Sequence, residues 1–146
     1  MTRIVALVWL AILATACSEG APESWSAAEM SALSEQFVHI AEAYAVVDVC
    51  MPMIDANKDA KSSVISKIDV RHYSKLSQMD TETELAKFFA HHRMSGGTDE
   101  QAATLNQIYR ESHQAAAKLL TSVDVCAETV SDYANTILNT KVRPTP

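Results

Sequence analysis

The side chains that could bind a metal ion are five histidines, three cysteines and six methionines. Thioether and imidazole ligands suit copper, and one hypothesis is a site built from His91, His92, Met94, Met51 and Met53. Adjacent side chains on a helix diverge by about 100°, so His91 and His92 do not readily chelate one ion together. We therefore predict no metal and no cofactor, with a Met/His metal or small-ligand site as the alternative.

Sequence signatures of common enzyme classes are not found. Gly96 and Gly97 follow a helical pattern, whereas a phosphate-binding glycine loop follows a strand. The chain has no G-x-S-x-G, H-E-x-x-H or C-x-x-C-H motif, the signatures of many hydrolases, zinc proteases and covalent haem proteins. A di-iron bundle needs E-x-x-H on two helices, and the nearest match is Asp69-Val70-Arg71-His72. We predict a protein that is not an enzyme, with no catalytic residue.

The N-terminal segment has the features of an export signal in their usual order. Arg3 precedes the apolar stretch Ile4 to Leu13, which is too short to span a bilayer, and the small residues Ala14-Thr15-Ala16 follow. The stretch Leu13-Ala14-Thr15-Ala16-Cys17 resembles the lipobox of bacterial lipoproteins, in which the cysteine is acylated and becomes the first mature residue. The resemblance implies lipidation of Cys17. Because Ser18 follows Cys17, the resemblance also implies delivery to the outer membrane, with the protein facing the periplasm.

Ordinary secretion is the alternative, because Ala14-Thr15-Ala16 also has the form of an A-x-A cleavage site. The protein would then be soluble in the periplasm or secreted, with a free thiol at Cys17. The expected organisation is a signal peptide over 1–16, a lipidated tether over 17–25, a helical bundle domain over 26–140 and a flexible tail over 141–146.

The two other cysteines, Cys50 and Cys126, are expected to form a disulfide, because export places them where disulfides persist. A crosslink over a loop of this length stabilises a fold by about 4 to 5 kcal/mol in the chain-entropy model. Redox catalysis is the weaker hypothesis, since the pair lacks the C-x-x-C spacing that lowers a thiol pKa.

The chain is acidic, with a formal net charge of −6. An acidic surface argues against binding nucleic acid, whose phosphates attract basic proteins. It also argues against adsorption to anionic lipid. We therefore expect attachment to the membrane through the lipid anchor alone.

A long first helix is predicted from Ser26 onwards. Ser26 and Glu29 form a capping-box pattern, and Trp25 is placed to pack against Met30 as a hydrophobic staple. Pro52 lacks an amide hydrogen and disfavours helix at the residue before it, so the helix should end or kink near Cys50. Steps of three and four separate its apolar residues, as in a stripe buried against partner helices. The stripe consists of Met30, Leu33, Phe37, Ile40, Tyr44, Val47, Met51 and Ile54.

Capping signals predict two further helices in the middle of the chain. Asn57 would begin one that runs to about Gln78. Asp80 or Thr81 would begin a short one that Gly96-Gly97 ends. The apolar face of the short helix consists of Leu85, Phe88, Phe89 and His92.

Thr98 and Gln101 mark the start of the last helical stretch, which is expected to pack along the first helix. A break near Thr121-Ser122 and an unbroken helix are both compatible with the pattern. The predicted fold is all-α, a small antiparallel helical bundle of about four helices with one disulfide. The apolar positions of this stretch are Ala102, Leu105, Tyr109, Ser112, Ala116, Leu119, Val123, Cys126, Val130, Tyr133 and Ile137.

Elimination leaves a non-catalytic envelope protein that binds another envelope or periplasmic protein, as an inhibitor, an immunity protein or an accessory subunit. A structural envelope lipoprotein that dimerises is a further alternative, and the oligomeric state and the partner are open. The candidate partner-binding residues are Phe88, His91, His92, Arg93 and Met94. The competing interpretation is that Phe88 and Phe89 simply close one end of the bundle.

Overall fold

A computed structural model describes residues 24–140 of the chain, and within this range it contains six α-helices and no strand. The all-α prediction is confirmed, whereas the expected number of about four helices is too low. The helices are α1 (Ala27–Asp55), α2 (Lys58–Ile68), α3 (Val70–Ser77), α4 (Thr81–Met94), α5 (Asp99–Leu119) and α6 (Val123–Asn139).

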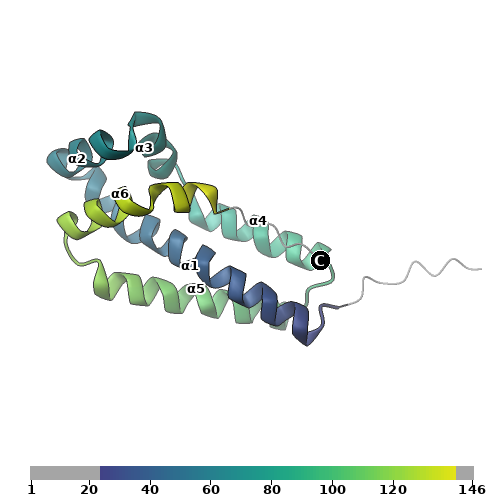
Figure 1. Cartoon of the computed structure of the whole chain (residues 1–146). Coiled ribbons are helices and arrows are strands. Elements are labelled where there is room, and N and C mark those ends of the chain that lie inside the picture. The colour runs from purple at the N-terminus through teal and green to yellow at the C-terminus, as the bar shows by residue number, and fades with distance from the viewer. Residues whose placement is uncertain (1–23, 141–146) are drawn as a thin grey trace, which may run out of the picture.

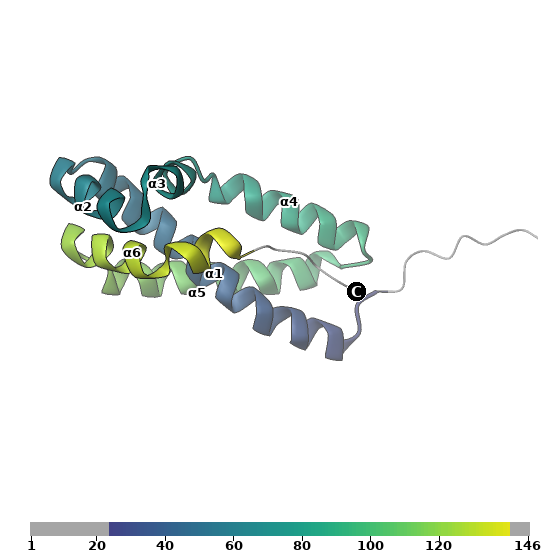
Figure 2. The ribbon, with the colours of Figure 1, turned by 45° about the horizontal axis from the view of Figure 1, so that its top comes forward.

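Helix α1 runs through the middle of the domain, with α4, α5 and α6 along it and α2 and α3 at the end where α1 finishes (Figures 1 and 2). The consecutive helices α4, α5 and α6 alternate in direction, as short connections require. Helix α4 runs antiparallel to α1. Helix α5 therefore starts at the same end as α1 and runs alongside it in the same direction. The antiparallel prediction therefore holds for α4 to α6 but not for the pair α1 and α5.

The predicted second helix is two helices, because the backbone turns sharply at Asp69. Asp69 has φ 68° and ψ 162°, a conformation that is costly for a residue with a side chain. Its carboxylate accepts hydrogen bonds from the amides of Arg71 and His72, at 2.7 and 2.9 Å, and so caps α3. The apolar periodicity runs across Asp69 without interruption, which is why the sequence pattern did not indicate a break.

The last helical stretch is also two helices, which settles the question that the pattern left open. Helix α5 ends at Leu119, and Ser122 caps α6 by accepting the amide hydrogen of Val125 at 3.3 Å. The break changes which side chains face the core: Leu119 is 75% exposed, whereas Leu120 is buried. Tyr133, which the pattern also placed in the stripe, is 57% exposed.

The prediction for the start of α1 is confirmed, whereas the predicted end near Cys50 is wrong. Ser26 and Glu29 form the capping box, and seven of the eight predicted stripe residues are buried, with Met30 half-buried. The helix does not end near Cys50 but continues through Pro52 to Asp55. Proline removes one helical hydrogen bond, and its side chain is exposed. The buried Met51 and Ile54 on either side hold the last turns in the core.

Helix α1 is the one helix among residues 24–140 that is long and apolar enough to cross a membrane. More than half of its most apolar segment is buried against the rest of the protein. Small residues such as Ala41, Ala43 and Ala45 are buried in addition to the predicted stripe. The apolar character of α1 is therefore that of a helix at the centre of a domain.

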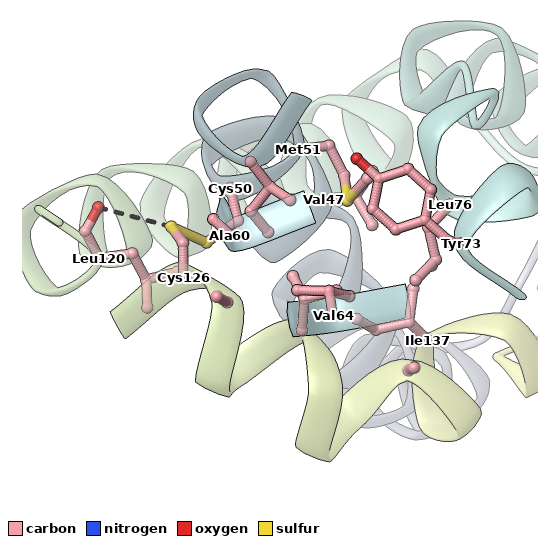
Figure 3. Close-up of a cluster of buried hydrophobic side chains, with 14 of the residues drawn as sticks. Val47, Cys50, Met51, Ala60, Val64, Tyr73, Leu76, Leu120, Cys126 and Ile137 are labelled. Carbon is pink, nitrogen blue, oxygen red and sulfur yellow. Dashed lines mark hydrogen bonds between the residues drawn. A yellow bond between two sulfur atoms is a disulfide. The ribbon is translucent and has the colours of Figure 1, made fainter. Parts of the chain in front are cut away.

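Two groups of buried side chains form the core, one in each half of the domain. The disulfide cluster surrounds the bond between Cys50 and Cys126, whose Cα atoms lie 5.0 Å apart although the residues are 76 apart in sequence. Figure 3 shows the disulfide at one edge of this cluster, between α1 and α6. The predicted pairing is thus present. The other members include Val47, Met51, Ile54, Ala60, Val64, Tyr73, Leu76, Leu120, Val130, Ala134 and Ile137.

The aromatic cluster fills the half of the domain in which α1 begins. Phe37 of α1 and Phe88 of α4 stack with ring centroids 4.9 Å apart, and both are buried. The side chain of Met79 packs against both clusters and so connects the two halves. The cluster consists of Trp25, Leu33, Phe37, Ile40, Ala41, Tyr44, Leu85, Phe88 and Leu105.

Candidate functional site

A cleft of about 640 Å³ opens between α4 and α5, with α1 beneath it. The capping of α4 by Asp80 fixes one rim, because the Asp80 carboxylate accepts the amide hydrogen of Thr83 at 3.1 Å. Met79, Leu85, Ala86 and Phe89 supply apolar surface. The polar lining consists of Asp48, Asp80, Thr81, Glu82, Asn106 and Tyr109.

Asp48 is the one polar side chain that α1 contributes to this cleft, and three helices meet at its carboxylate. The Thr81 hydroxyl at the start of α4 donates to Oδ1, and the Tyr109 hydroxyl of α5 donates to Oδ2. Asp48 is half-buried and Thr81 is buried. Since a carboxylate can accept about four hydrogen bonds, Asp48 keeps capacity for a ligand in the cleft.

The cleft is negatively charged and suited to a positively charged hydrogen-bond donor. Burial raises the pKa of Tyr109, and its hydrogen bond to Asp48 and the negative charge there raise it further. The phenol therefore remains a neutral donor to Asp48. Hydrogen bonds from Thr83 lower the pKa of Asp80, which keeps that carboxylate charged. With Glu82, the cleft has three carboxylates and no basic side chain in its lining.

This arrangement suits an extended organic cation. Among residues 24–140, no three histidine, cysteine, aspartate or glutamate side chains lie close enough to hold a metal ion, so the three carboxylates of the cleft are spread along it. A ligand with an alkyl stem and a charged head would pack on Leu85 and Phe89 and present its charge to Asp48. Lysine and arginine side chains have this form.

No protein family, curated protein or solved structure matches this chain.

The five candidate partner-binding residues are divided between the interior and the surface. Phe88 is 3% exposed and His92 is fully buried, so neither can contact a partner while the domain is folded. His91, Arg93 and Met94 are exposed at the end of α4. The interpretation in which Phe88 closes the end of the bundle describes its position in the aromatic cluster.

His92 occupies an unusual position at this end. Its ring lies 5.2 Å from that of Trp25 and stacks with Phe88, centroid to centroid 6.5 Å, and neither ring nitrogen has a hydrogen-bond partner. Burial lowers its pKa, and the charge of Arg93 lowers it further. Gly97 packs against the ring so closely that a Cβ there would lie 2.1 Å from Nε2. His92 is thus a neutral core residue, packed from both sides.

The alternative metal set is not brought together. Met51 and Met53 belong to or pack against the disulfide cluster at the far end of α1, whereas His91, His92 and Met94 lie at the end of α4 beside Trp25. Within the histidine pair, His91 is exposed and His92 is buried, as expected for adjacent helical residues. These five side chains do not form one site.

The lipidation residue Cys17 lies outside the described residues, so its acylation stays a prediction. Trp25, which the sequence assigned to the tether, belongs to the folded domain, where it is buried. Its indole N–H donates to the carbonyl of Ser95 at 2.9 Å.

Sequence reasoning missed the cleft, although one signal was present. Asp48 is an acidic residue within the long apolar run of α1, and a charged residue there needs a partner or a function. Tyr109 was identified from its periodicity as a core position, but that pattern says nothing about where its hydroxyl goes. The hydrogen bonds of Asp48 with Thr81 and Tyr109 join residues that are up to 61 positions apart in sequence, which a local pattern does not reveal.

Proposed function

We propose that this chain is a non-catalytic lipoprotein of the bacterial cell envelope, and that its acidic cleft binds another protein by accepting one of its basic side chains. The observation that carries the proposal is the lining of the cleft, with three carboxylates, four apolar side chains and no cation. An inhibitor, an immunity protein and an accessory subunit are all compatible with this mode of binding.

The chemistry of the Asp48 site favours binding over catalysis. The two side chains that contact Asp48 are hydroxyl donors, and the raised pKa of Tyr109 makes it a poor general base. The net charge of −6 supports the same mode of binding, because an acidic protein attracts a basic partner from a distance and speeds association.

An oligolysine peptide and its fully acetylated form provide a direct test. Titrated into the mature protein and followed by the amide signals of its NMR spectrum, the lysine form should shift the signals of residues that line the cleft. The acetylated form has the same backbone and no charge, and should shift none of them. Equal shifts with both peptides would contradict recognition of a cation.

The variant Asp48→Asn removes the charge and keeps the shape, and its amide can still pair with the hydroxyls of Thr81 and Tyr109. We expect affinity for the lysine peptide to fall about tenfold or more, because a hydrogen bond to a charged group contributes about 1.5 to 3 kcal/mol. Asp132→Asn is the matched control, since Asp132 is exposed on α6 and outside the cleft lining. A partner captured from envelope extract should be retained by Asp132→Asn and lost by Asp48→Asn.

A further inference from the structure

The chain enters the folded domain at a fixed point, Trp25. The indole N–H donates to the Ser95 carbonyl, and the side-chain amide of Gln101 donates to the Trp25 carbonyl, each at 2.9 Å. These bonds tie the start of α1 to the segment between α4 and α5 and to the first turn of α5. Any anchor on the N-terminal side of Trp25 therefore holds the domain by this end.

The distance from the proposed anchor to this point is short. Seven residues lie between Cys17 and Trp25, and the eight residue-to-residue steps that join these two span at most about 27 Å when fully extended. Helix α1 has 29 residues, which corresponds to about 43 Å at 1.5 Å per residue. Helix α2 follows the far end of α1 (Figure 1), so α2 lies farther from Trp25 than the tether can extend, and Cys17 cannot reach it.

The region named here the α4–α5 turn consists of the last turn of α4 and the segment that joins it to α5, residues 91–98. It carries an exposed apolar side chain at the anchored end. Met94 is 80% exposed, the highest value among the exposed large hydrophobic residues of the described chain. It directly precedes Ser95, whose carbonyl accepts the hydrogen bond from Trp25. Within residues 24–140 this thioether side chain is largely uncovered, and the residue after it is hydrogen-bonded to Trp25, where the tether ends.

The charges around the turn exclude electrostatic adsorption as the cause of membrane contact. Arg93 pairs with Asp99 at 3.0 Å, and Glu100 adds a further negative charge beside them. Such a surface does not attract anionic lipid, and one methionine buries too little apolar area to hold a protein on a bilayer. The contact must come from the anchor, which confines this end to the lipid surface.

We propose that the α4–α5 turn is the membrane-facing surface of the protein, with Met94 against the phospholipid headgroup layer and α2 and α3 farthest from the bilayer. The inference rests on the proposed lipid anchor at Cys17. Helix α4 has 14 residues, about 21 Å at 1.5 Å per residue, and the cleft lies at the start of this helix. The cleft is thereby held above the membrane, where a soluble periplasmic partner can reach it.

Energy transfer from two labelled positions tests the orientation. The lipidated protein, carrying a fluorescent donor at Met94→Cys or at the exposed Ser62→Cys of α2, is reconstituted into phosphatidylethanolamine and phosphatidylglycerol vesicles that contain an acceptor lipid. We expect transfer from position 94 to be several times that from position 62. Equal transfer from both positions, or stronger transfer from position 62, would overturn the proposal.

Two controls separate this inference from the proposed function. The mature chain with Cys17→Ser should stay in solution when mixed with the same vesicles, and it should still bind the oligolysine peptide in its cleft. Vesicle binding by this unanchored form would show that the folded surface itself drives contact and would contradict the argument from the anchor. Mass measurement of the N-terminus in the purified lipoprotein must show acylation at Cys17, because an unmodified cysteine there removes the basis of the proposal.

Discussion

The two halves of the core are held together by different means. The disulfide cluster is mainly aliphatic and has a covalent bond between α1 and α6. The aromatic cluster, at the proposed membrane-facing end, has no crosslink within the described residues and depends on the close fit of Trp25, Phe37, Phe88 and the buried His92. The stability of the first half therefore depends on the chain entropy that the crosslink removes from the unfolded state. The stability of the second half depends on the fit of its side chains and on His92 remaining unprotonated.

This difference implies that the two halves respond to different perturbations. Reduction acts on the end where α2, α3 and α6 meet α1, while small steric changes and acid act on the end where the chain enters the domain. Met79, which packs against both clusters, is the side chain through which a disturbance of one can reach the other.

The largest expected effect follows removal of the disulfide in the variant Cys50→Ala with Cys126→Ala. A crosslink that closes a loop of 76 residues should contribute about 4 to 5 kcal/mol in the chain-entropy model. The free energy of unfolding in urea should fall by about this amount. Hydrogen exchange should accelerate most in α2 and α6, and equal acceleration throughout α4 would contradict the division into two differently held halves.

Periodicity and capping predicted much of this fold because both are local. The stripe of α1, the caps Ser26 and Thr98 and the glycine stop after α4 each depend on residues within a few positions of one another. The disulfide was predictable for a different reason, since the predicted export to an oxidising compartment and the predicted lipidation of Cys17 leave a single pairing of cysteines.

Features that depend on contacts between residues distant in sequence were not predictable. The turn at Asp69 lies within a continuous apolar pattern, and the sequence does not show that the carboxylate caps α3 instead of continuing a helix. Likewise, nothing local shows that α4 and α5 bring Thr81 and Tyr109 onto Asp48. The burial of His92 follows from its helical face, but the absence of a hydrogen-bond partner does not.

An intermediate effect is expected for Gly97→Ala, which tests the close fit of the aromatic half. A Cβ would lie 2.1 Å from Nε2 of His92, so the buried ring must move, and overpacking of this kind costs about 1 to 3 kcal/mol. The same substitution in a His92→Ala background should cost much less, because the ring is gone. A double-mutant cycle on the free energy of unfolding measures the coupling, and additive effects would show that Gly97 does not limit the ring.

The smallest effect concerns pH, because it involves one proton at one site. His92 is neutral in the folded state, and burial holds its pKa below the ordinary value of 6.5. Below about pH 6.5 the imidazole takes up a proton in the unfolded chain but not in the folded one. The free energy of unfolding is therefore at its full value above this pH. It falls as the pH decreases, until the pH reaches the folded-state pKa of His92. His92→Leu fills a similar volume without a ring nitrogen and should lose less stability than the wild type between pH 7.5 and 5. The exposed His91→Leu provides the control, and if it flattens the pH dependence as much as His92→Leu does, the acid sensitivity does not arise from the aromatic half of the core.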